Sequence, residues 1–363
     1  MGKDSQGNAK SLRGSLSKPM MFRKEQWNSG AVRQWLLGTT NQFHYLWKRN
    51  NWMLDPRSWF GKLDDVSIDR PIFLLGVQGG GLTLLSRMLR RHPQVVSVSG
   101  NHHYWSGADE MHTVLGPILP PELTGTRYKV PWSDHPVFKP PRSWTYACDE
   151  LLPFYRKTAQ DATPELKRVF ERVIRMCIAR HALDKRNARF VDKSQVYTVR
   201  VSLIRELLKE YKPKFVLVVN NPYAACYRAA LGKAKDMERL KGKLSFKERL
   251  EICAQHWANS VRCALKDRDE DMLVVRFEDL LREPGATLRR ICQHVELDFR
   301  QDMLPGPHQK IPFGSRFRDR WYPLSIKRAL HYIEKATPEE LEIISVRCGA
   351  LANELGYEAY STS

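Results

Sequence analysis

The sequence predicts an α/β domain, in which a mostly parallel sheet is covered by helices on both faces. Short apolar runs, typical of strands buried on both sides, alternate with longer segments of helical periodicity. The first apolar run leads into three consecutive glycines and then into a helix. The 363-residue chain is 42% hydrophobic and 27% charged, which suits a globular domain with a sizeable core.

Five apolar runs predict the strands, at residues 72–76, 95–98, 189–192, 215–219 and 272–276. Helical spacing predicts helices over residues 84–89, 164–183, 199–208, 246–266, 284–295 and 338–355. Two segments follow neither period: the proline-rich residues 116–145, a candidate substrate-facing insertion, and the Gly/Pro/Arg-rich residues 304–323. Strands that alternate with helices in this way favour parallel pairing.

We divide the chain into a basic, tryptophan-rich N-terminal extension, residues 1–69, and a domain over residues 70–358. Residues 1–20 are polar and basic, so we expect them to lack fixed structure. Residues 22–60 mix aromatic with basic side chains. That mixture fits short helices packed on the domain, or a surface in peripheral contact with an anionic membrane.

The formal net charge of +19 favours an anionic ligand or partner. No zinc finger, basic-region heptad or RNA-binding aromatic pattern is present, so we expect no nucleic-acid partner. The seven cysteines form no C-x-x-C pair, which indicates free thiols in a reducing, cytoplasmic setting. No Cys/His cluster has zinc spacing, and no apolar run approaches the length of a membrane helix, so neither a metal nor a membrane span is expected.

The three glycines Gly79, Gly80 and Gly81 predict a P-loop-like phosphate site. Glycine allows the backbone to approach a ligand closely, and the first N–H groups of the following helix point at an anion. A nucleoside-triphosphate loop would continue with lysine and a hydroxyl residue, whereas here Leu82 and Thr83 follow. Hydrolysis of ATP or GTP is therefore disfavoured.

A dinucleotide site is disfavoured as well. Leu84 stands where the dinucleotide pattern requires its third glycine. The second predicted strand ends in Ser99, Gly100 and Asn101, without the acidic residue that would bind a ribose. The phosphate ligand is thus of another kind.

Four segments, in order along residues 70–357, resemble those of PAPS-dependent sulfotransferases. Residues 71–89 resemble the family's 5′-phosphosulfate loop, and residues 214–224 resemble its 3′-phosphate segment. Residues 273–284 and 314–357 resemble its strand-and-helix motif and its C-terminal stretch. The resemblance implies the sulfotransferase fold, with PAPS (3′-phosphoadenosine 5′-phosphosulfate) as co-substrate and no metal.

The resemblance also implies which residues bind the nucleotide. They are the loop residues Gly79, Gly80, Gly81, Leu82, Thr83 and Leu84, then Asn220 and Arg228 of the second segment, and Arg316 and Arg318 of the C-terminal loop. The chain departs from the family at several of these positions. Family members place Arg or Lys at Gly79, Arg at Asn220, Ser at Arg228, and hydroxyl residues at Gly80 and Leu82. Two expected cations are therefore absent, and Arg228 is an unexpected one.

The resemblance implies a catalytic base in the loop after the second strand. A glutamate is usual where Asn101 stands, so the adjacent His102 and His103 are our candidates, with pKa values suited to the task. Asp109 and Glu110 are reserves.

Lys193 matches a lysine that the family often carries after its third strand, which makes it a third candidate catalytic residue. Glu278 and Asp279 can be interpreted as a paired catalytic acid. We favour a structural interpretation, in which Asp279 caps a helix and Glu278 pairs with a cation.

The function implied is in-line transfer of the sulfuryl group of PAPS to a hydroxyl or amine acceptor. The altered loops favour an alternative, a non-catalytic protein that keeps the fold and an anion site. A kinase-like P-loop protein that binds ATP is a third possibility.

Overall fold

The computed structural model describes residues 65–103, 109–124, 145–233, 235–306 and 324–358, together with Leu63 and a few residues between 39 and 56. The chain divides into two compact units, Met1–His44 and Tyr45–Ser363, and the sheet belongs to the second. Arg316 and Arg318, most of the predicted extension, residues 125–144 and residues 307–323 lie outside the described residues.

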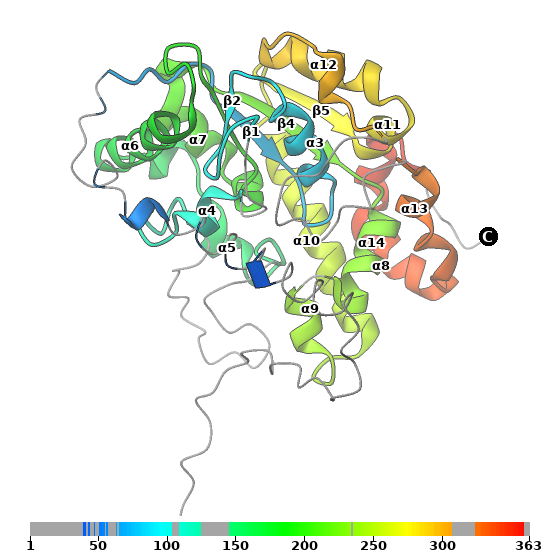
Figure 1. The fold of residues 1–363 in the computed structure, drawn as a ribbon. Coiled ribbons are helices and arrows are strands. Elements are labelled where there is room, and N and C mark those ends of the chain that lie inside the picture. The colour runs from blue at the N-terminus through cyan, green and yellow to red at the C-terminus, as the bar shows by residue number, and fades with distance from the viewer. Residues whose placement is uncertain are drawn as a thin grey trace, which may run out of the picture. The chain divides into compact units, whose positions relative to one another are not determined.

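Among the described residues the sheet has five strands, β1 (Ile72–Leu75), β2 (Val95–Val96), β3 (Arg189–Asp192), β4 (Lys214–Val219) and β5 (Met272–Arg276) (Figure 1). Their order across the sheet is β2-β3-β1-β4-β5, and every pairing is parallel. All five correspond to the apolar runs, so the predicted α/β fold is confirmed. Because the strands are parallel, their carboxyl ends meet at one edge of the sheet.

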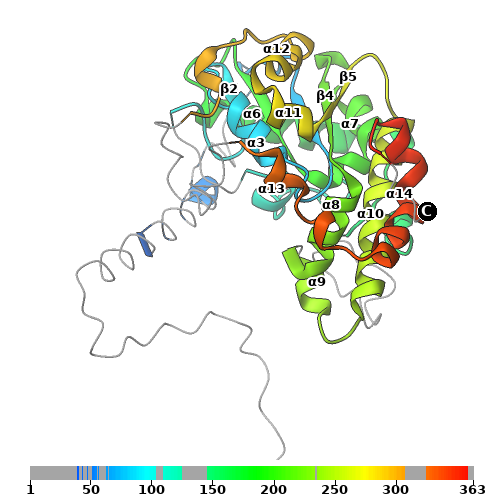
Figure 2. The ribbon, with the colours of Figure 1, turned by 90° about the vertical axis from the view of Figure 1, so that its right-hand side faces the viewer.

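Alternate strand residues face two separate hydrophobic cores. Phe73 and Phe215 belong to one core, and Ile72 and Val216 belong to the other. The first core is packed by α6 (Pro164–His181), α7 (Val201–Leu208), α8 (Pro222–Arg228), α10 (Phe246–Lys266) and α14 (Pro338–Glu354). The second is packed by α3 (Leu82–Leu89) and α12 (Pro284–Val295), which lie together on the near side of the sheet in Figure 2.

The long helices start at residues that satisfy their first N–H groups. The side chains of Thr163, Ser245 and Thr337 cap α6, α10 and α14, and the last two form reciprocal capping boxes with Glu248 and Glu340. These caps explain why the predicted starts of all three helices agree with the structure.

Several short elements were not predicted. They are α4 (Met111–Val114), α5 (Leu152–Tyr155), the 3₁₀ helix η4 (Gln195–Val199), α9 (Lys235–Leu240), the 3₁₀ helix η7 (Gln301–Met303) and α13 (Ile326–Leu330). Each is too short to show helical periodicity in its apolar residues. A cavity is lined by α13 and by α11 (Phe277–Arg282), the short helix that the resemblance over residues 273–284 implied.

Candidate functional site

A cavity of about 430 Å³ lies at the carboxyl ends of the strands. It is lined by the start of α3, by residues that follow β3 and β4, and by α8, α11 and α13. Of the predicted site residues, the structure brings seven together here: Gly79, Gly81, Leu82, Thr83, Leu84, Asn220 and Arg228. Gly80 lies in the same loop but does not line the cavity.

The glycine loop exposes N–H groups to this cavity. Gly79 and Gly81 have φ values of 82° and 88°, which side chains rarely adopt, and Gly81 is the N-cap of α3. The N–H groups of Leu84 and Leu85 bond to the Gly81 carbonyl at 2.9 and 3.2 Å. Within the described residues, no acceptor faces the N–H groups of Leu82 and Thr83. These two donors are available to an anion.

The start of the loop is fixed from the neighbouring strand. The Gly76 N–H donates to the hydroxyl of Thr198 at 2.8 Å, and that hydroxyl donates back to the Gly76 carbonyl at 3.2 Å. Thr198 is completely buried in η4, which follows β3. These two hydrogen bonds anchor the point at which the loop leaves β1.

Asn220 lines the cavity, and its side-chain oxygen is held by a neighbouring indole. The indole N–H of Trp257 donates to the side-chain oxygen of Asn220 at 3.3 Å. Because an indole N–H can only donate, it fixes which end of the amide faces it. The NH₂ group of Asn220 is turned the other way. A neutral amide thus stands where the sequence resemblance implied a cation.

A chain of hydrogen bonds holds the start of α8. The Glu278 carboxylate is 3% exposed and accepts from the Asn221 N–H at 2.9 Å and from the Tyr357 hydroxyl at 2.8 Å. The Asn221 side chain in turn accepts from the N–H groups of Tyr223 and Ala224. Tyr357, near the end of the chain, thereby positions α8 through Glu278.

The predicted roles of Glu278 and Asp279 need correction. Glu278 binds an N–H and a hydroxyl rather than a cation. Asp279 does not cap α11, since no side chain caps that helix, and instead it lies 3.7 Å from Arg282. The helix begins immediately after β5, which leaves Asp279 inside its first turn.

Sequence reasoning missed one wall of the cavity. It is formed by Phe277 of α11 and by residues in and beside α13, Arg328, His331 and Tyr332. Phe277 follows the carboxyl end of β5, so the position of that strand was a usable signal. Ser325 was a second usable signal, for the start of α13, because its side chain accepts from the Arg328 N–H and caps that helix.

The two candidate histidines do not line the cavity. Burial, and then the neighbouring His103, lower the pKa of His102, with Arg300 and Asp302 as its next charged neighbours. The Asp302 carbonyl accepts from Arg91, which lies just beyond the C-terminal end of α3. The glycine loop is at the opposite end of that helix. Their predicted role as base gains no support from this placement.

Lys193 lies in a buried ion cluster and does not line the cavity. Its ammonium group is 3.1 Å from Asp109 and 2.9 Å from Glu110, and Asp109 also pairs with the fully buried Arg90 at 3.2 Å. Burial alone would lower the pKa of Lys193, but the two carboxylates outweigh it and raise the pKa. Asp109 and Glu110 are thus balanced by Lys193 and Arg90, and the cluster fastens the start of α4 to the end of β3.

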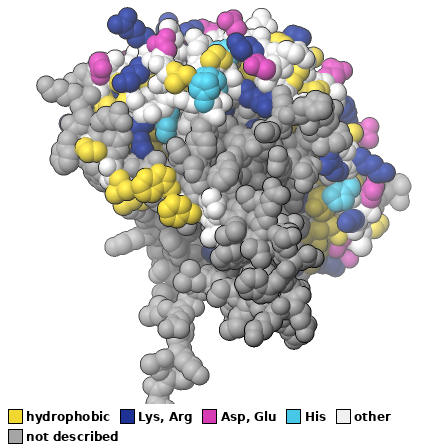
Figure 3. Space-filling model, viewed as in Figure 1, with side chains coloured by type: hydrophobic (Ala, Val, Ile, Leu, Met, Phe, Trp, Pro, Cys, Tyr) yellow, Lys and Arg dark blue, Asp and Glu magenta, His cyan; other side chains and the backbone are white. Residues whose placement is uncertain are grey.

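The remaining sequence expectations concern thiols, metals, membranes and charge. All seven cysteines are free, and six of them are buried. In the described part of the chain, no group of His, Cys, Asp and Glu has a metal-binding arrangement, and no helix could span a bilayer. Figure 3 shows basic and acidic side chains interspersed around α12.

Comparison with known proteins places the chain in a family. A model of the sulfotransferase family matches residues 71–301, more than half of the 363-residue chain. The chain belongs to the sulfotransferase family. A search of curated protein sequences found no match.

Solved structures with this fold are similar at low identity. A sulfotransferase from Mycobacterium avium is 15% identical, with a TM-score of 0.49 over 86% of this chain and 82% of that one. The sulfotransferase domain of the Synechococcus PCC 7002 olefin synthase is 20% identical, with a TM-score of 0.46 over 82% and 98%. A mouse sulfotransferase in complex with PAP is 13% identical, with a TM-score of 0.39 over 81% and 91%.

Proposed function

We propose that the protein binds PAPS in this cavity and transfers its sulfuryl group to a hydroxyl or amine acceptor. The observation that carries the proposal is the convergence of the open N–H groups of α3 and the guanidinium of Arg228 in one cavity at the carboxyl ends of the strands. A cavity of about 430 Å³ falls within the range of nucleotide-sized sites.

The lining residues suit the parts of such a nucleotide. The N–H groups of Leu82 and Thr83 are donors for the 5′-phosphosulfate. The Phe277 ring offers an apolar face on which a base can stack. The amide NH₂ of Asn220 is a further donor for a phosphate oxygen.

In the reaction, the acceptor oxygen or nitrogen forms a bond to sulfur, while the bond from sulfur to the 5′-phosphate oxygen breaks in line. The electron pair of that bond leaves with PAP (adenosine 3′,5′-bisphosphate), and the acceptor's proton passes to a base. Positive charge and N–H groups beside the departing oxygen stabilise the charge that develops on it. Holding the nucleotide rigidly favours the in-line geometry.

Release of PAP tests this proposal. Purified protein is incubated with PAPS and a panel of hydroxyl and amine acceptors, and PAP and the sulfated product are quantified together. We expect equal amounts of the two with at least one acceptor, and none when PAPS is omitted. If His102 or His103 is the base, His102→Ala or His103→Ala should abolish turnover while PAP binding is kept.

A non-catalytic role is the second candidate, favoured by the positions of His102, His103 and Lys193 away from the cavity. In that case PAP binds and the product assay stays blank with every acceptor. Stronger stabilisation by ATP than by PAP would instead favour a kinase-like nucleotide site.

A further inference from the structure

The guanidinium of Arg228 occupies the space beside Gly79. A Cβ atom added at Gly79 would lie 3.5 Å from the Arg228 Cζ, and closer still to Nη1, within a distance that real Cβ atoms essentially never show. Arg228 is the last residue of α8, whereas Gly79 belongs to the loop after β1. The present position of Arg228 and any side chain at residue 79 therefore exclude each other.

Arg228 has no counter-charge within the described part of the chain. It is half-buried at the cavity wall, and no carboxylate there forms an ion pair with it. Buried arginines elsewhere do have partners, as Arg90 has Asp109 at 3.2 Å. A half-buried guanidinium without an internal partner, next to the open N–H groups of Leu82 and Thr83, creates a strongly anion-attracting position.

We propose that Arg228 is the cation of the glycine loop. Its guanidinium binds the anionic group that the loop holds, the 5′-phosphosulfate end of the nucleotide, and glycine at position 79 leaves room for it. This inference rests on the proposed function and deepens it. The charge reaches the loop from α8, rather than from a side chain of the loop itself.

The assignment differs from the one implied by sequence resemblance, which gave Arg228 to the 3′-phosphate. Position along the chain places Arg228 eight residues after Asn220, just beyond the 3′-phosphate segment of residues 214–224. The structure directs Nη1 toward Gly79, at the loop that caps α3. During transfer, a guanidinium at this position stabilises the charge on the departing 5′-phosphate oxygen, because the planar fork can donate two hydrogen bonds.

The first test compares two ligands by isothermal titration calorimetry. PAP carries both phosphates, and adenosine 3′-monophosphate lacks the 5′-phosphate. We expect Arg228→Met to weaken PAP by at least about tenfold, the usual effect of losing a charged hydrogen bond. Adenosine 3′-monophosphate should bind the variant within about twofold of wild type. Arg228→Lys keeps the positive charge but lacks the planar guanidinium. Its affinity for PAP should lie between those of the wild type and of Arg228→Met.

The second test is a double-mutant cycle between Gly79 and Arg228. Gly79→Ala should weaken PAP binding in the wild-type background, because its methyl group displaces the Arg228 guanidinium. In the Arg228→Met background Gly79→Ala should weaken PAP binding less, because only the backbone strain of alanine at a φ of 82° remains. Gly81→Ala is the matched control: its φ is also positive, but its methyl group meets the Phe277 ring, so its effect should add to that of Arg228→Met.

Three results would overturn the inference while leaving the proposed function standing. They are unchanged PAP affinity in Arg228→Met, an equal loss for both ligands, and additive effects of Gly79→Ala and Arg228→Met. A wild-type protein that does not bind PAP overturns the proposed function, and this inference with it. Circular dichroism and melting of each variant separate loss of binding from loss of folding.

Discussion

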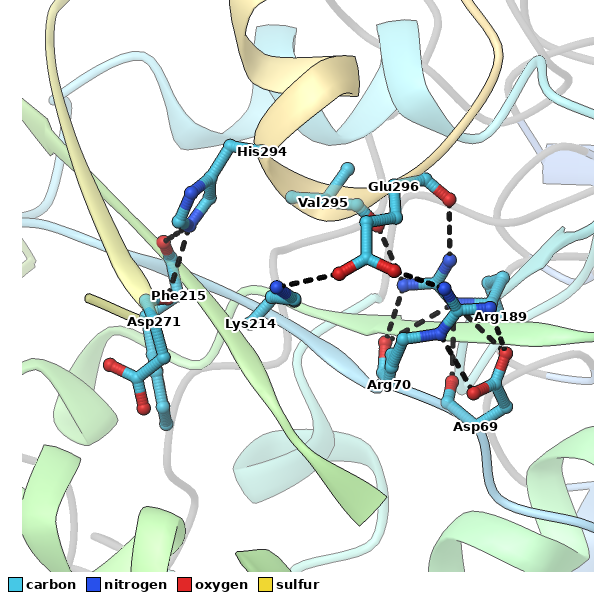
Figure 4. A network of polar contacts seen from close by, with 9 residues as sticks. All are labelled: Asp69, Arg70, Arg189, Lys214, Phe215, Asp271, His294, Val295 and Glu296. Atoms are coloured by element: carbon cyan, nitrogen blue, oxygen red, sulfur yellow. Dashed lines mark hydrogen bonds and ion pairs between the residues drawn. The ribbon is translucent and has the colours of Figure 1, made fainter. Parts of the chain in front are cut away.

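The basic side chains at the amino ends of the strands differ from Arg228, which lines the cavity at the carboxyl ends. At the amino ends of the strands, Arg70, Arg189 and Lys214 are bound to Asp69, Glu296 and backbone carbonyls (Figure 4). At the carboxyl ends, Arg228 faces a cavity, and no described carboxylate pairs with it. Both ends belong to the same parallel sheet. The comparison therefore distinguishes basic side chains that stabilise the fold from one that is available to a ligand.

Arg189 is the clearest example of a basic side chain that stabilises the fold. It is 2% exposed, and its guanidinium donates to the carbonyls of Asp69, Arg70, Val295 and Glu296. It thus joins the start of β3 to the segment before β1 and to the end of α12. Its donors are used within the protein, so a ligand could gain little from it.

The largest effect is expected from removing this structural arginine. Arg189→Met leaves several buried carbonyls without donors, and should lower the free energy of unfolding by about 3–5 kcal/mol. Urea denaturation measures the loss, and PAP titration of the folded variant should give the wild-type affinity. A loss below about 1 kcal/mol would contradict the structural role assigned to the amino ends.

A smaller loss of stability is expected at Tyr357, whose hydroxyl both stabilises the fold and helps to position α8 at the cavity. Tyr357→Phe removes one of the two donors that the buried Glu278 carboxylate receives from Tyr357 and Asn221. We expect a loss of about 1–2 kcal/mol in unfolding free energy. PAP should also bind more weakly, because the start of α8 is less firmly held.

The control for that variant is Tyr223→Phe, whose hydroxyl bonds at 3.4 Å to the neutral hydroxyl of Ser345. Tyr223→Phe should lower the free energy of unfolding less than Tyr357→Phe does, and it should leave the affinity for PAP unchanged. Equal effects of the two variants would show that Glu278 does not relay the position of Tyr357 to α8.

At the amino ends, acid should weaken the network slightly. A hydrogen bond from Lys214, and then one from Arg70, lower the pKa of Glu296 from 4.5 to about 2. A depressed carboxyl pKa adds stability that is complete above about pH 4.5 and is lost as the pH falls through about 2.

Because the Glu296 side chain is 44% exposed, solvent screening limits this contribution to below about 1 kcal/mol. Glu296→Gln should flatten the dependence of unfolding free energy on pH between 5 and 2, as measured by urea denaturation at fixed ionic strength. A slope as steep as that of the wild type would assign the acid sensitivity to other carboxyls.

The smallest change in stability is expected at the carboxyl ends. Without nucleotide, Arg228→Met should alter the unfolding free energy by no more than about 0.5 kcal/mol, since no described carboxylate pairs with Arg228. Melting of the free proteins tests this against Arg189→Met, which removes the same side-chain type. A large loss at Arg228 would mean that this guanidinium also holds the fold together.

The sequence predicted the sheet and its long helices well, because their signals are local. Apolar runs identified the strands, and caps such as Thr163 and Ser245 marked the starts of helices. The glycine loop was equally clear. Three consecutive glycines between a strand and a helix allow positive φ values and close approach of a ligand to the backbone, which is typical of a phosphate site.

The side chains around the site were harder to predict, because their partners are distant in sequence. Glu110 pairs with Lys193, 83 residues away, and that contact turns a candidate catalytic lysine into a buried structural one. The proximity of Arg228 to Gly79 depends on how α8 leaves the end of β4. Neither arrangement has a local signature in the sequence.

The most direct test of the central claim is a thermal-shift titration of the wild-type protein with PAP, using ATP and NAD as controls. A ligand at 100 times its Kd adds about 2.7 kcal/mol to stability, which is an easily measured shift. The structure predicts that PAP raises the melting temperature in a saturable way and that ATP and NAD do so far less. No shift with PAP up to millimolar concentration would contradict the account, leaving the cavity without the nucleotide it was proposed to bind.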